Sequence, residues 1–466
     1  MSPQVKPDLP PLPTTANDIT LEWLKSIISK TTTGGRNIIG VKARSGVMFS
    51  GGNSSVAIFD LIYEECDDLA SQASAALANP PKSVCIKVMP KDSLVPGWLL
   101  KRFWKAEVFY YQKLFSSAMG FPQPTCYYSA YEKTHAVIVM NEMTKGRLSC
   151  GDSTRDLTYE EACLSVLILA RFHAKWWNAT DPRLSKLGRF DSSESGITCK
   201  FLMGGAKNML EVEEYAPIHP LVRAMMSKVK GLFRLMRRGP FTLTHGDSRS
   251  DNFFYEGEVA EDEVFDFDQQ SYDKILADDD DSSASSIGSV ASSAKSQPMS
   301  IGATSINSDE GSLSAKAALC DFQMIMVSNP MRDYANFVVN SLSPADRRSW
   351  NDKLIKLYHA EIIREGVDVG AFTYQQAKID AKVMTFWPMM CNISIAHKSQ
   401  ASFKDYEARI AAGETLNTKE QRHFNLLKKT RTRLMSAAKD AGLLNLLNDC
   451  SSDLPLPFIP CCCYWC

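Results

Sequence analysis

The segment 241–255 constrains the fold of this chain more than any other stretch. An apolar run ends at Thr244, a compact polar turn carries Asp247 and, five residues later, Asn252, and an aromatic run then resumes the apolar pattern. Apolar runs on both sides of a short polar turn predict a strand, a loop and a second strand. We therefore expect Asp247 and Asn252 to lie on one tight loop.

This loop carries the residue types that phosphoryl transfer requires. The reaction needs a carboxylate that accepts the proton of the attacking hydroxyl, and oxygen ligands that hold Mg²⁺ on the phosphates. Asp247 and Asn252 supply one of each, and their spacing equals the kinase pattern H-R-D-x-x-x-x-N with glycine in place of arginine. Aspartate and asparagine are also common turn residues, so a purely structural turn is the alternative.

A glycine-rich hairpin precedes this loop by a long interval. Strand-like sequence from Ile38 leads into Gly51, Gly52, Asn53 and Ser54, and a second apolar run follows. Small residues let backbone N–H groups approach phosphate oxygens closely. The same residues form ordinary hairpin turns, so the order of the motifs along the chain carries the interpretation.

A lysine and a glutamate follow in the order that kinases use. Lys87 lies inside the short apolar run 83–89, and Glu107 lies in the helical pattern 98–115. A glutamate at this position predicts an ion pair that holds the lysine toward the phosphates. A lysine on the solvent face of a strand is the simpler reading of residue 87 alone.

Two aspartates compete for the second metal-binding position. Asp266 follows Asn252 closely, whereas Asp321 opens the sequence Asp-Phe-Gln beyond an acidic, serine-rich stretch. We favour Asp321, because Asp333 follows it at the start of an apolar helical pattern. Asp333 is expected to cap that helix and to brace the catalytic loop.

Together these motifs resemble the aminoglycoside phosphotransferase and choline-kinase-like superfamily, nearest the ecdysteroid-kinase-like (CHK kinase-like) group. The resemblance rests on His245-Gly-Asp with Asn252, and on Asp321-Phe-Gln with Asp333, and it covers roughly residues 19–345. It implies that the strand 135–143 leads into a hinge whose backbone, at Asn141 and Met143, bonds the adenine of ATP. The C-terminal helices would then build the acceptor pocket.

Composition bounds the remaining possibilities. The 466 residues carry 52 basic and 53 acidic side chains, so the net charge is near zero and does not favour binding to nucleic acid. The proline-rich start lacks the features of a secretory signal, and no apolar run is long enough to span a bilayer. We expect a cytoplasmic protein with a small-molecule partner and reduced cysteines.

The chain divides by composition into successive regions. A disordered leader (1–17) is followed by a nucleotide-binding N-lobe (18–143) and a C-lobe (144–460) that holds the catalytic and acceptor sites. Asp18 is expected to be the N-cap of a first helix that runs to Lys30. An acidic, serine-rich insertion (257–316) is predicted to be disordered and to separate two strands of a hairpin. The cysteine-rich tail (461–466) is a candidate membrane tether, although it matches a prenylation box poorly.

Helical patterns in the last part of the C-lobe span residues 345–364, 374–400 and 418–447. The helical patterns of the C-lobe carry two further candidates. His173 lies near the end of the helical pattern 158–178. It is expected to be a structural core residue rather than a catalytic one. A cluster formed by Phe386, Trp387, Met389 and Met390 either lines the acceptor pocket or forms a core stripe, and the core reading is the simpler one.

The sequence thus predicts an α+β, bilobal, protein-kinase-like fold with a small antiparallel-sheet N-lobe and a larger, mainly helical C-lobe. It predicts transfer of the γ-phosphoryl group of ATP to a hydroxyl of a small molecule, with Asp247 as the catalytic base. Asn252 and Asp321 would hold Mg²⁺, and Lys87 with Glu107 would contact the phosphates. The alternative from another class is a catalytically silent, nucleotide-binding scaffold.

Overall fold

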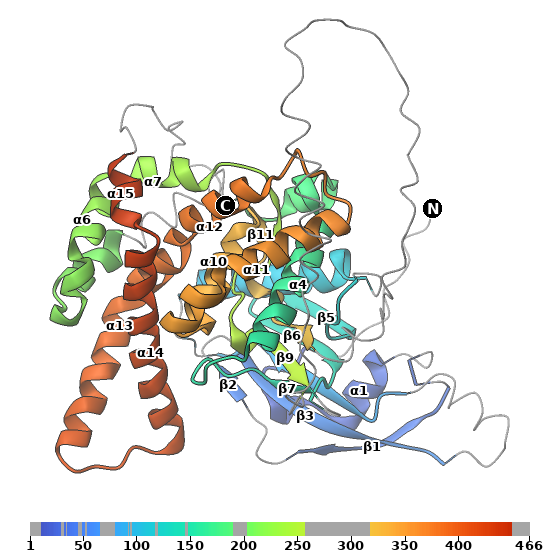
Figure 1. Cartoon of the computed structure of the whole chain (residues 1–466). Coiled ribbons are helices and arrows are strands. Elements are labelled where there is room, and N and C mark those ends of the chain that lie inside the picture. The colour runs from blue at the N-terminus through green and yellow to red at the C-terminus, as the bar shows by residue number, and fades with distance from the viewer. Residues whose placement is uncertain are drawn as a thin grey trace, which may run out of the picture.

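A computed structural model describes most of both predicted lobes. The described residues are 11–28, 32–33, 35–44, 49–51, 54–65, 80–91, 93, 96–116, 120–144, 148–189, 203–256 and 317–449. Residues 1–10 of the predicted leader, the insertion 257–316 and the tail 461–466 lie outside them. The described chain forms a small sheet-containing lobe and a larger helical lobe (Figure 1).

The N-lobe is a six-stranded antiparallel sheet with the order β1-β3-β4-β6-β5, in which β2 pairs with β3. Its strands are β1 (Ile38–Ala43), β2 (Phe49–Gly51), β3 (Ser54–Tyr63), β4 (Ser83–Val88), β5 (Cys126–Glu132) and β6 (His135–Asn141). Among the described residues, helices α1 (Leu21–Ile27) and α3 (Gly97–Phe109) pack on this sheet, and a π-helical turn (Tyr110–Leu114) extends α3.

Strand β4 illustrates how the sheet separates its two faces. Val84, Ile86 and Val88 belong to the same buried cluster as Trp23 and Leu24 of α1. Because side chains alternate along a strand, Lys87 points to the opposite face, toward α3 and the C-lobe. The solvent-face reading of this lysine is therefore wrong, since Lys87 is buried.

The start of the N-lobe differs from the prediction in two details. Leu12, inside the predicted leader, is buried in the N-lobe cluster, so order begins before residue 18. The N-cap of α1 is Thr20, whose side chain accepts a hydrogen bond from the backbone of Trp23, rather than Asp18. The Asp18 carboxylate is instead occupied by the backbone and hydroxyl groups of the preceding threonines.

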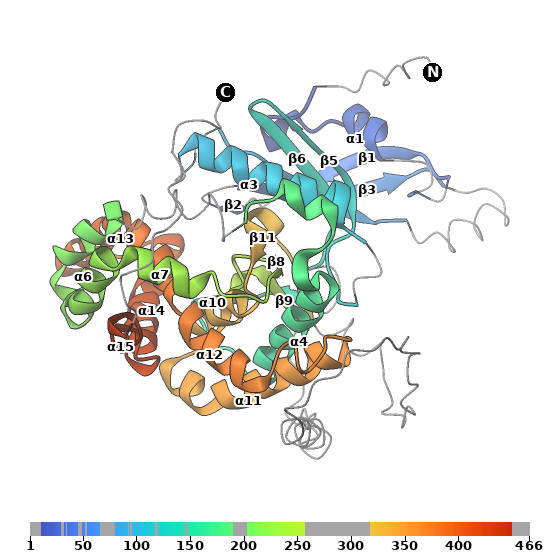
Figure 2. The same ribbon diagram turned by 90° about the horizontal axis from the view of Figure 1, so that it is seen from above.

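The C-lobe surrounds helix α4 (Tyr159–Lys175), which begins with a capping box formed by Thr158 and Glu161. Further helices of the described residues include α6 (His219–Ser227), α7 (Val229–Met236), α10 (Met331–Ser341), α11 (Pro344–Arg364), α12 (Tyr374–Met384), α13 (Phe386–Ala411), α14 (Thr418–Asp440) and α15 (Leu443–Asn448). Figures 1 and 2 both place α6, α13, α14 and α15 together on one side of this lobe, away from the N-lobe sheet.

Two small sheets of the C-lobe hold the site loops. One pairs β8 (Thr242–Thr244) with β11 (Met326–Ser328), and the other has the order β10-β9-β7. In the second sheet, β9 (Phe253–Glu256) pairs antiparallel with β10 (Ala317–Leu319), and β7 (Leu148–Cys150) completes it. The insertion 257–316 therefore separates two paired strands of a hairpin, as the sequence predicts.

The sequence merges helices that the structure separates. The predicted helix 374–400 is two helices that meet at Thr385, because Pro388 in the first turn of α13 cannot continue the hydrogen-bond ladder of α12. The predicted helix 418–447 likewise divides at Gly442, whose φ of 62° ends α14.

The predicted α+β, two-lobed fold is confirmed, with an antiparallel-sheet N-lobe and a mainly helical C-lobe. Among the helices of the described ranges, none combines the length and the hydropathy needed to cross a membrane.

Candidate active site

The loop between β8 and β9 depends on a glycine that no other residue could replace without strain. Gly246 has φ +87°, and a Cβ atom built there would lie 2.2 Å from the carbonyl oxygen of Met324. Residues with a side chain avoid this backbone region, and the neighbouring loop leaves no room for one. The glycine that replaces the kinase arginine is thus required by the packing of two loops against each other.

Asp333 holds the catalytic loop from the first turn of α10. Its carboxylate accepts hydrogen bonds from the backbone N–H groups of His245 and Gly246 and from the ring of His173. Burial raises the pKa of Asp333, but the hydrogen bond and charge of His173 outweigh it and keep the pKa below its ordinary value. The predicted bracing role agrees with this geometry. The predicted capping role is wrong, because the carboxylate accepts hydrogen bonds from the loop and none from the first turn of α10.

His173 is a fully buried residue, as expected for a structural histidine. Besides its contact with Asp333, its Nδ1 atom lies 2.7 Å from the hydroxyl of Tyr358 on α11. One histidine therefore joins three helices, α4, α10 and α11, behind the catalytic loop.

His245 links the catalytic loop to the Asp-Phe-Gln loop. Its Nε2 atom lies 2.8 Å from the carbonyl oxygen of Cys320, and its Nδ1 atom lies 3.3 Å from the backbone nitrogen of Asp247. A carbonyl accepts and a backbone N–H donates, so a neutral ring protonated at Nε2 satisfies both contacts.

The Asp321 segment lies directly against Asn252. The backbone N–H of Cys320 donates to the carbonyl oxygen of Asn252 over 3.0 Å. Asp321 itself has left-handed backbone angles (φ 65°), and one of its carboxylate oxygens accepts a hydrogen bond from Gln323. Phe322 stacks on Tyr110 of the N-lobe with ring centroids 3.8 Å apart, which anchors the segment.

Lys87 connects the two lobes through a pair of carboxylates. Its Nζ atom lies 2.7 Å from Glu107 Oε2 and 2.7 Å from Asp321 Oδ1. Burial lowers the pKa of Lys87, but the charges of Asp321 and Glu107 outweigh it, so the pKa lies above the ordinary value and the lysine stays charged. Burial also raises the pKa of Glu107, against the attraction of Lys87. The structure thus brings Lys87 and Glu107, the pair predicted to contact the phosphates, together with Asp321, the predicted metal ligand.

The Asp247 side chain is only 21% exposed, and this partial burial favours a proton acceptor. Burial raises the pKa of its carboxyl, Arg249 lowers it and the Asp321 charge raises it further. A raised pKa brings a carboxylate closer to the value at which it accepts a proton effectively near neutral pH.

Arg249 is a residue of this loop that sequence reasoning missed. Its guanidinium lies 3.5 Å from Asp247 and 3.7 Å from Asp251, and its Nε atom is buried without a hydrogen-bond partner among the described residues. Its position between two aspartates of the motif is the signal that could have identified it.

The donor set fits Mg²⁺ bound mainly to phosphates. The amide nitrogen of Asn252 donates to the carbonyl oxygen of Asp247, so the amide oxygen is the atom that a metal ion would use. Within the described residues no group of three or more His, Cys, Asp or Glu side chains forms a metal cage. Mg²⁺ characteristically takes one or two protein oxygens together with substrate phosphates and water, and Asn252 with Asp321 supplies that number.

The glycine-rich hairpin and the hinge are described in part. Gly51 pairs with Ser54 across the β2–β3 hairpin, whereas Gly52 and Asn53 lie outside the described residues. At the end of β6, the Asn141 side chain accepts a hydrogen bond from the backbone of Thr125 and donates to the sulfur of Met143.

Glu142, between the two predicted hinge residues, was not identified from the sequence. It lies in an ion-pair cluster with Arg44, at 2.6 Å, and also accepts hydrogen bonds from Ser83 and Thr144. Arg44 in turn pairs with Asp60 of β3. The cluster fixes the end of β6 against the sheet.

The cluster of Phe386, Trp387, Met389 and Met390 is buried, as the core reading predicts, and Trp387 covers the guanidinium of Arg332 at 3.7 Å.

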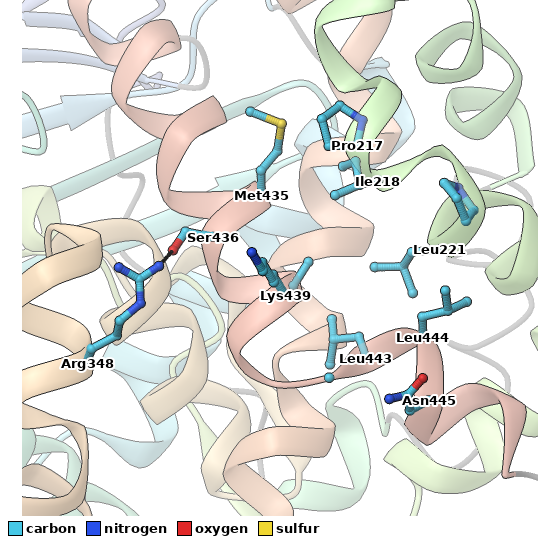
Figure 3. A pocket seen from close by; sticks show the side chains of 13 residues that line it. Pro217, Ile218, Leu221, Arg348, Met435, Ser436, Lys439, Leu443, Leu444 and Asn445 are labelled. Carbon is cyan, nitrogen blue, oxygen red and sulfur yellow. Dashed lines mark hydrogen bonds between the residues drawn. The ribbon is translucent and has the colours of Figure 1, made fainter.

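A cavity of about 470 Å³ lies elsewhere, between α6, α14 and α15 (Figure 3). It is lined mainly by apolar side chains such as Leu221 and Leu443, and none of the predicted site residues lines it.

The fold and site therefore define a two-lobed α+β protein in which a buried lysine pairs with carboxylates of both lobes. A family model described as "Uncharacterized oxidoreductase dhs-27" matches residues 305–422. None of the curated protein sequences matches the chain.

Solved structures are similar over most of their length. A choline kinase from Cryptosporidium parvum Iowa II is 9% identical, with a TM-score of 0.48, and the match covers 92% of this chain and 98% of that one. A putative aminoglycoside phosphotransferase from Ralstonia eutropha JMP134 is 11% identical, with a TM-score of 0.44 and coverage of 90% and 97%. A spectinomycin phosphotransferase in complex with ADP and its antibiotic is 12% identical, with a TM-score of 0.43 and the same coverage. At these identities the similarity is one of fold.

Proposed function

We propose that this chain is an ATP-dependent phosphotransferase that moves the γ-phosphoryl group to a hydroxyl of a small molecule. The observation that carries the proposal is the meeting of Asp247, Asn252 and Asp321 beside the buried Lys87. The contact between Cys320 and Asn252 and the ion pair between Lys87 and Asp321 support it. The names of the similar structures agree with it, and the geometry of this chain supplies the argument.

The proposed roles follow from position and charge. Asp247 accepts the proton of the acceptor hydroxyl while that oxygen bonds to the γ-phosphorus and the bond to the β-phosphate oxygen breaks, which releases ADP. Lys87, fixed by Glu107, neutralises phosphate charge, and Asn252 and Asp321 would hold Mg²⁺. Bound Mg²⁺ supplies charge neutralisation across the phosphates, and the protein contributes mainly positioning.

The nucleotide would lie under the N-lobe sheet. The β2–β3 hairpin, with Gly51, Gly52, Asn53 and Ser54, is proposed to cover its phosphates. The backbone at Asn141 and Met143 is proposed to bond the adenine, and the ion-pair cluster of Glu142 would keep that segment rigid.

The test is Mg²⁺-dependent consumption of ATP over a panel of hydroxylated metabolites. We expect turnover with at least one acceptor class, and we expect Asp247→Asn to abolish it with little loss of ATP binding. Undiminished turnover by Asp247→Asn would exclude the assigned base. ATP binding without turnover over a broad panel would favour the silent scaffold.

A further inference from the structure

Helix α14 carries a buried arginine at the back of the candidate active site. The Arg433 side chain is only 3% exposed, and its guanidinium is surrounded by acceptors. Nη1 donates to the carbonyl oxygens of Ser153 and Asn340, and Nη2 donates to the Asp156 carboxylate and to the carbonyl oxygens of Arg155 and Ser341. One side chain therefore joins α14 to the loop after β7 and to the end of α10.

Both of these segments hold the same part of the catalytic loop. The backbone N–H and the hydroxyl of Ser153 donate to the Asp251 carboxylate over 2.9 and 2.7 Å. The hydroxyl of Ser341 accepts from the backbone N–H of Ser250 over 2.9 Å. Ser250 and Asp251 immediately precede Asn252, so their position sets that of the Asn252 amide.

The segment after β7 lies so close to the catalytic loop that Gly151 has no room for a side chain. A Cβ atom at that residue would lie 2.0 Å from the carbonyl oxygen of Ser250. The segment carrying Ser153 is thus in direct backbone contact with the catalytic loop, and a shift of one displaces the other.

The chemistry of this position demands arginine. The last carbonyl groups of α10 have no partners within the helix, and a planar guanidinium with five N–H donors can satisfy several of them together with Asp156. Lysine offers a compact ammonium group with three donors and cannot reproduce this fork. The substitution Arg433→Lys would therefore keep the charge and lose the geometry.

We propose that Arg433 is a positioning residue for the proposed phosphoryl transfer, which sets the metal-binding end of the catalytic loop through Ser153 and Ser341. The inference rests on the proposed function. Helix α14 then supports the active site through Arg433, from behind the catalytic loop. Residues that orient metal ligands from behind commonly contribute about ten- to hundredfold to metal affinity.

The chain offers a matched control against the same helix. Arg347 of α11 is also buried, and it pairs with Asp440 and with the Arg433 carbonyl oxygen of α14. Its hydrogen bonds run to α14 and not to the segments that hold the catalytic loop. Arg433→Lys and Arg347→Lys therefore both loosen α14, but only the first removes hydrogen bonds to the segments that hold the catalytic loop.

The test measures Mn²⁺ affinity in the presence of ADP, by electron paramagnetic resonance, so that no acceptor needs to be known. We expect Arg433→Lys to weaken Mn²⁺ binding about tenfold or more. Arg347→Lys should change the Mn²⁺ affinity less than about twofold, at a similar loss of thermal stability. This variant keeps the hydrogen bonds of Arg433 to the segments that hold the loop. Ser341→Ala, which leaves Arg433 intact, should weaken Mn²⁺ binding several-fold.

Two failures are distinguishable. Absence of Mn²⁺–ADP binding by the wild-type protein would refute the proposed function. Normal binding by the wild type with equal effects of the two arginine variants, or with no effect of Ser341→Ala, would refute the positioning role alone.

Discussion

Replacing Gly246 by alanine should damage both stability and catalysis, because two separate costs fall on one residue. At φ +87° an alanine loses about 1–2 kcal/mol relative to an ordinary backbone conformation. The added Cβ would also lie 2.2 Å from the carbonyl oxygen of Met324 and 3.1 Å from the Arg332 guanidinium. Relieving an overlap of this kind in a packed region costs about 1–3 kcal/mol more.

Gly413 provides the control for the backbone cost. It has nearly the same φ, +82°, and a Cβ there would meet nothing within 4 Å. Gly413→Ala should therefore lose about 1–2 kcal/mol. Gly246→Ala should lose about 2–5 kcal/mol in total.

The assays are urea unfolding followed by circular dichroism, and ATP turnover on the best acceptor. Relief of the overlap must move the loop by on the order of 1 Å, and such a displacement of a catalytic group costs about a hundredfold in rate. We expect Gly413→Ala to retain full turnover. Equal unfolding free energies for the two variants, with unchanged turnover in both, would refute the packing argument.

Two further predictions concern buried charges. Lys87→Met leaves the carboxylates of Glu107 and Asp321 without their shared cation, so urea unfolding should show a loss of about 3–5 kcal/mol in the free energy of unfolding. Adding Glu107→Gln should recover part of this loss. An unchanged urea midpoint in Lys87→Met alone would contradict the pairing. Asp380, buried between Asn329 and Gln376, has its pKa raised to about 6 by burial. A raised folded-state pKa favours the protonated acid, so stability from this group is present below about pH 4 and is lost as the pH rises through about 6. Wild type should therefore lose about 3 kcal/mol relative to Asp380→Asn between about pH 4 and pH 7, measured by urea unfolding, and a difference that stays constant with pH would contradict the shift.

Local sequence patterns predicted the parts of the fold that depend on local chemistry. The strand before Asp247 and the helix that begins near residue 158 follow from the periodicity of their apolar residues. The break at Thr385 was missed because the apolar pattern continues across it, although Pro388 carried the signal. The N-cap at Thr20 was missed because Asp18 has equal capping chemistry.

The site was predictable only where its residues stand in recognisable motifs. Lys87 and Glu107 could be paired in advance because their order along the chain matches a known arrangement. Arg433 could not, since its partners are backbone carbonyl groups from segments distant in sequence. The need for glycine at 246 likewise arises from a carbonyl on another loop.

The most direct test of the account compares two aspartates as metal ligands. Calorimetric titration with ATP, in Mg²⁺ and in EDTA, should be carried out on the wild type, Asp321→Asn and Asp266→Asn. In Asp321→Asn, most of the increase in ATP affinity that Mg²⁺ gives should be lost. Asp266→Asn should keep this increase. Loss of the Mg²⁺ effect in Asp266→Asn, with normal binding by Asp321→Asn, would contradict the assignment of the metal to Asp321 and Asn252.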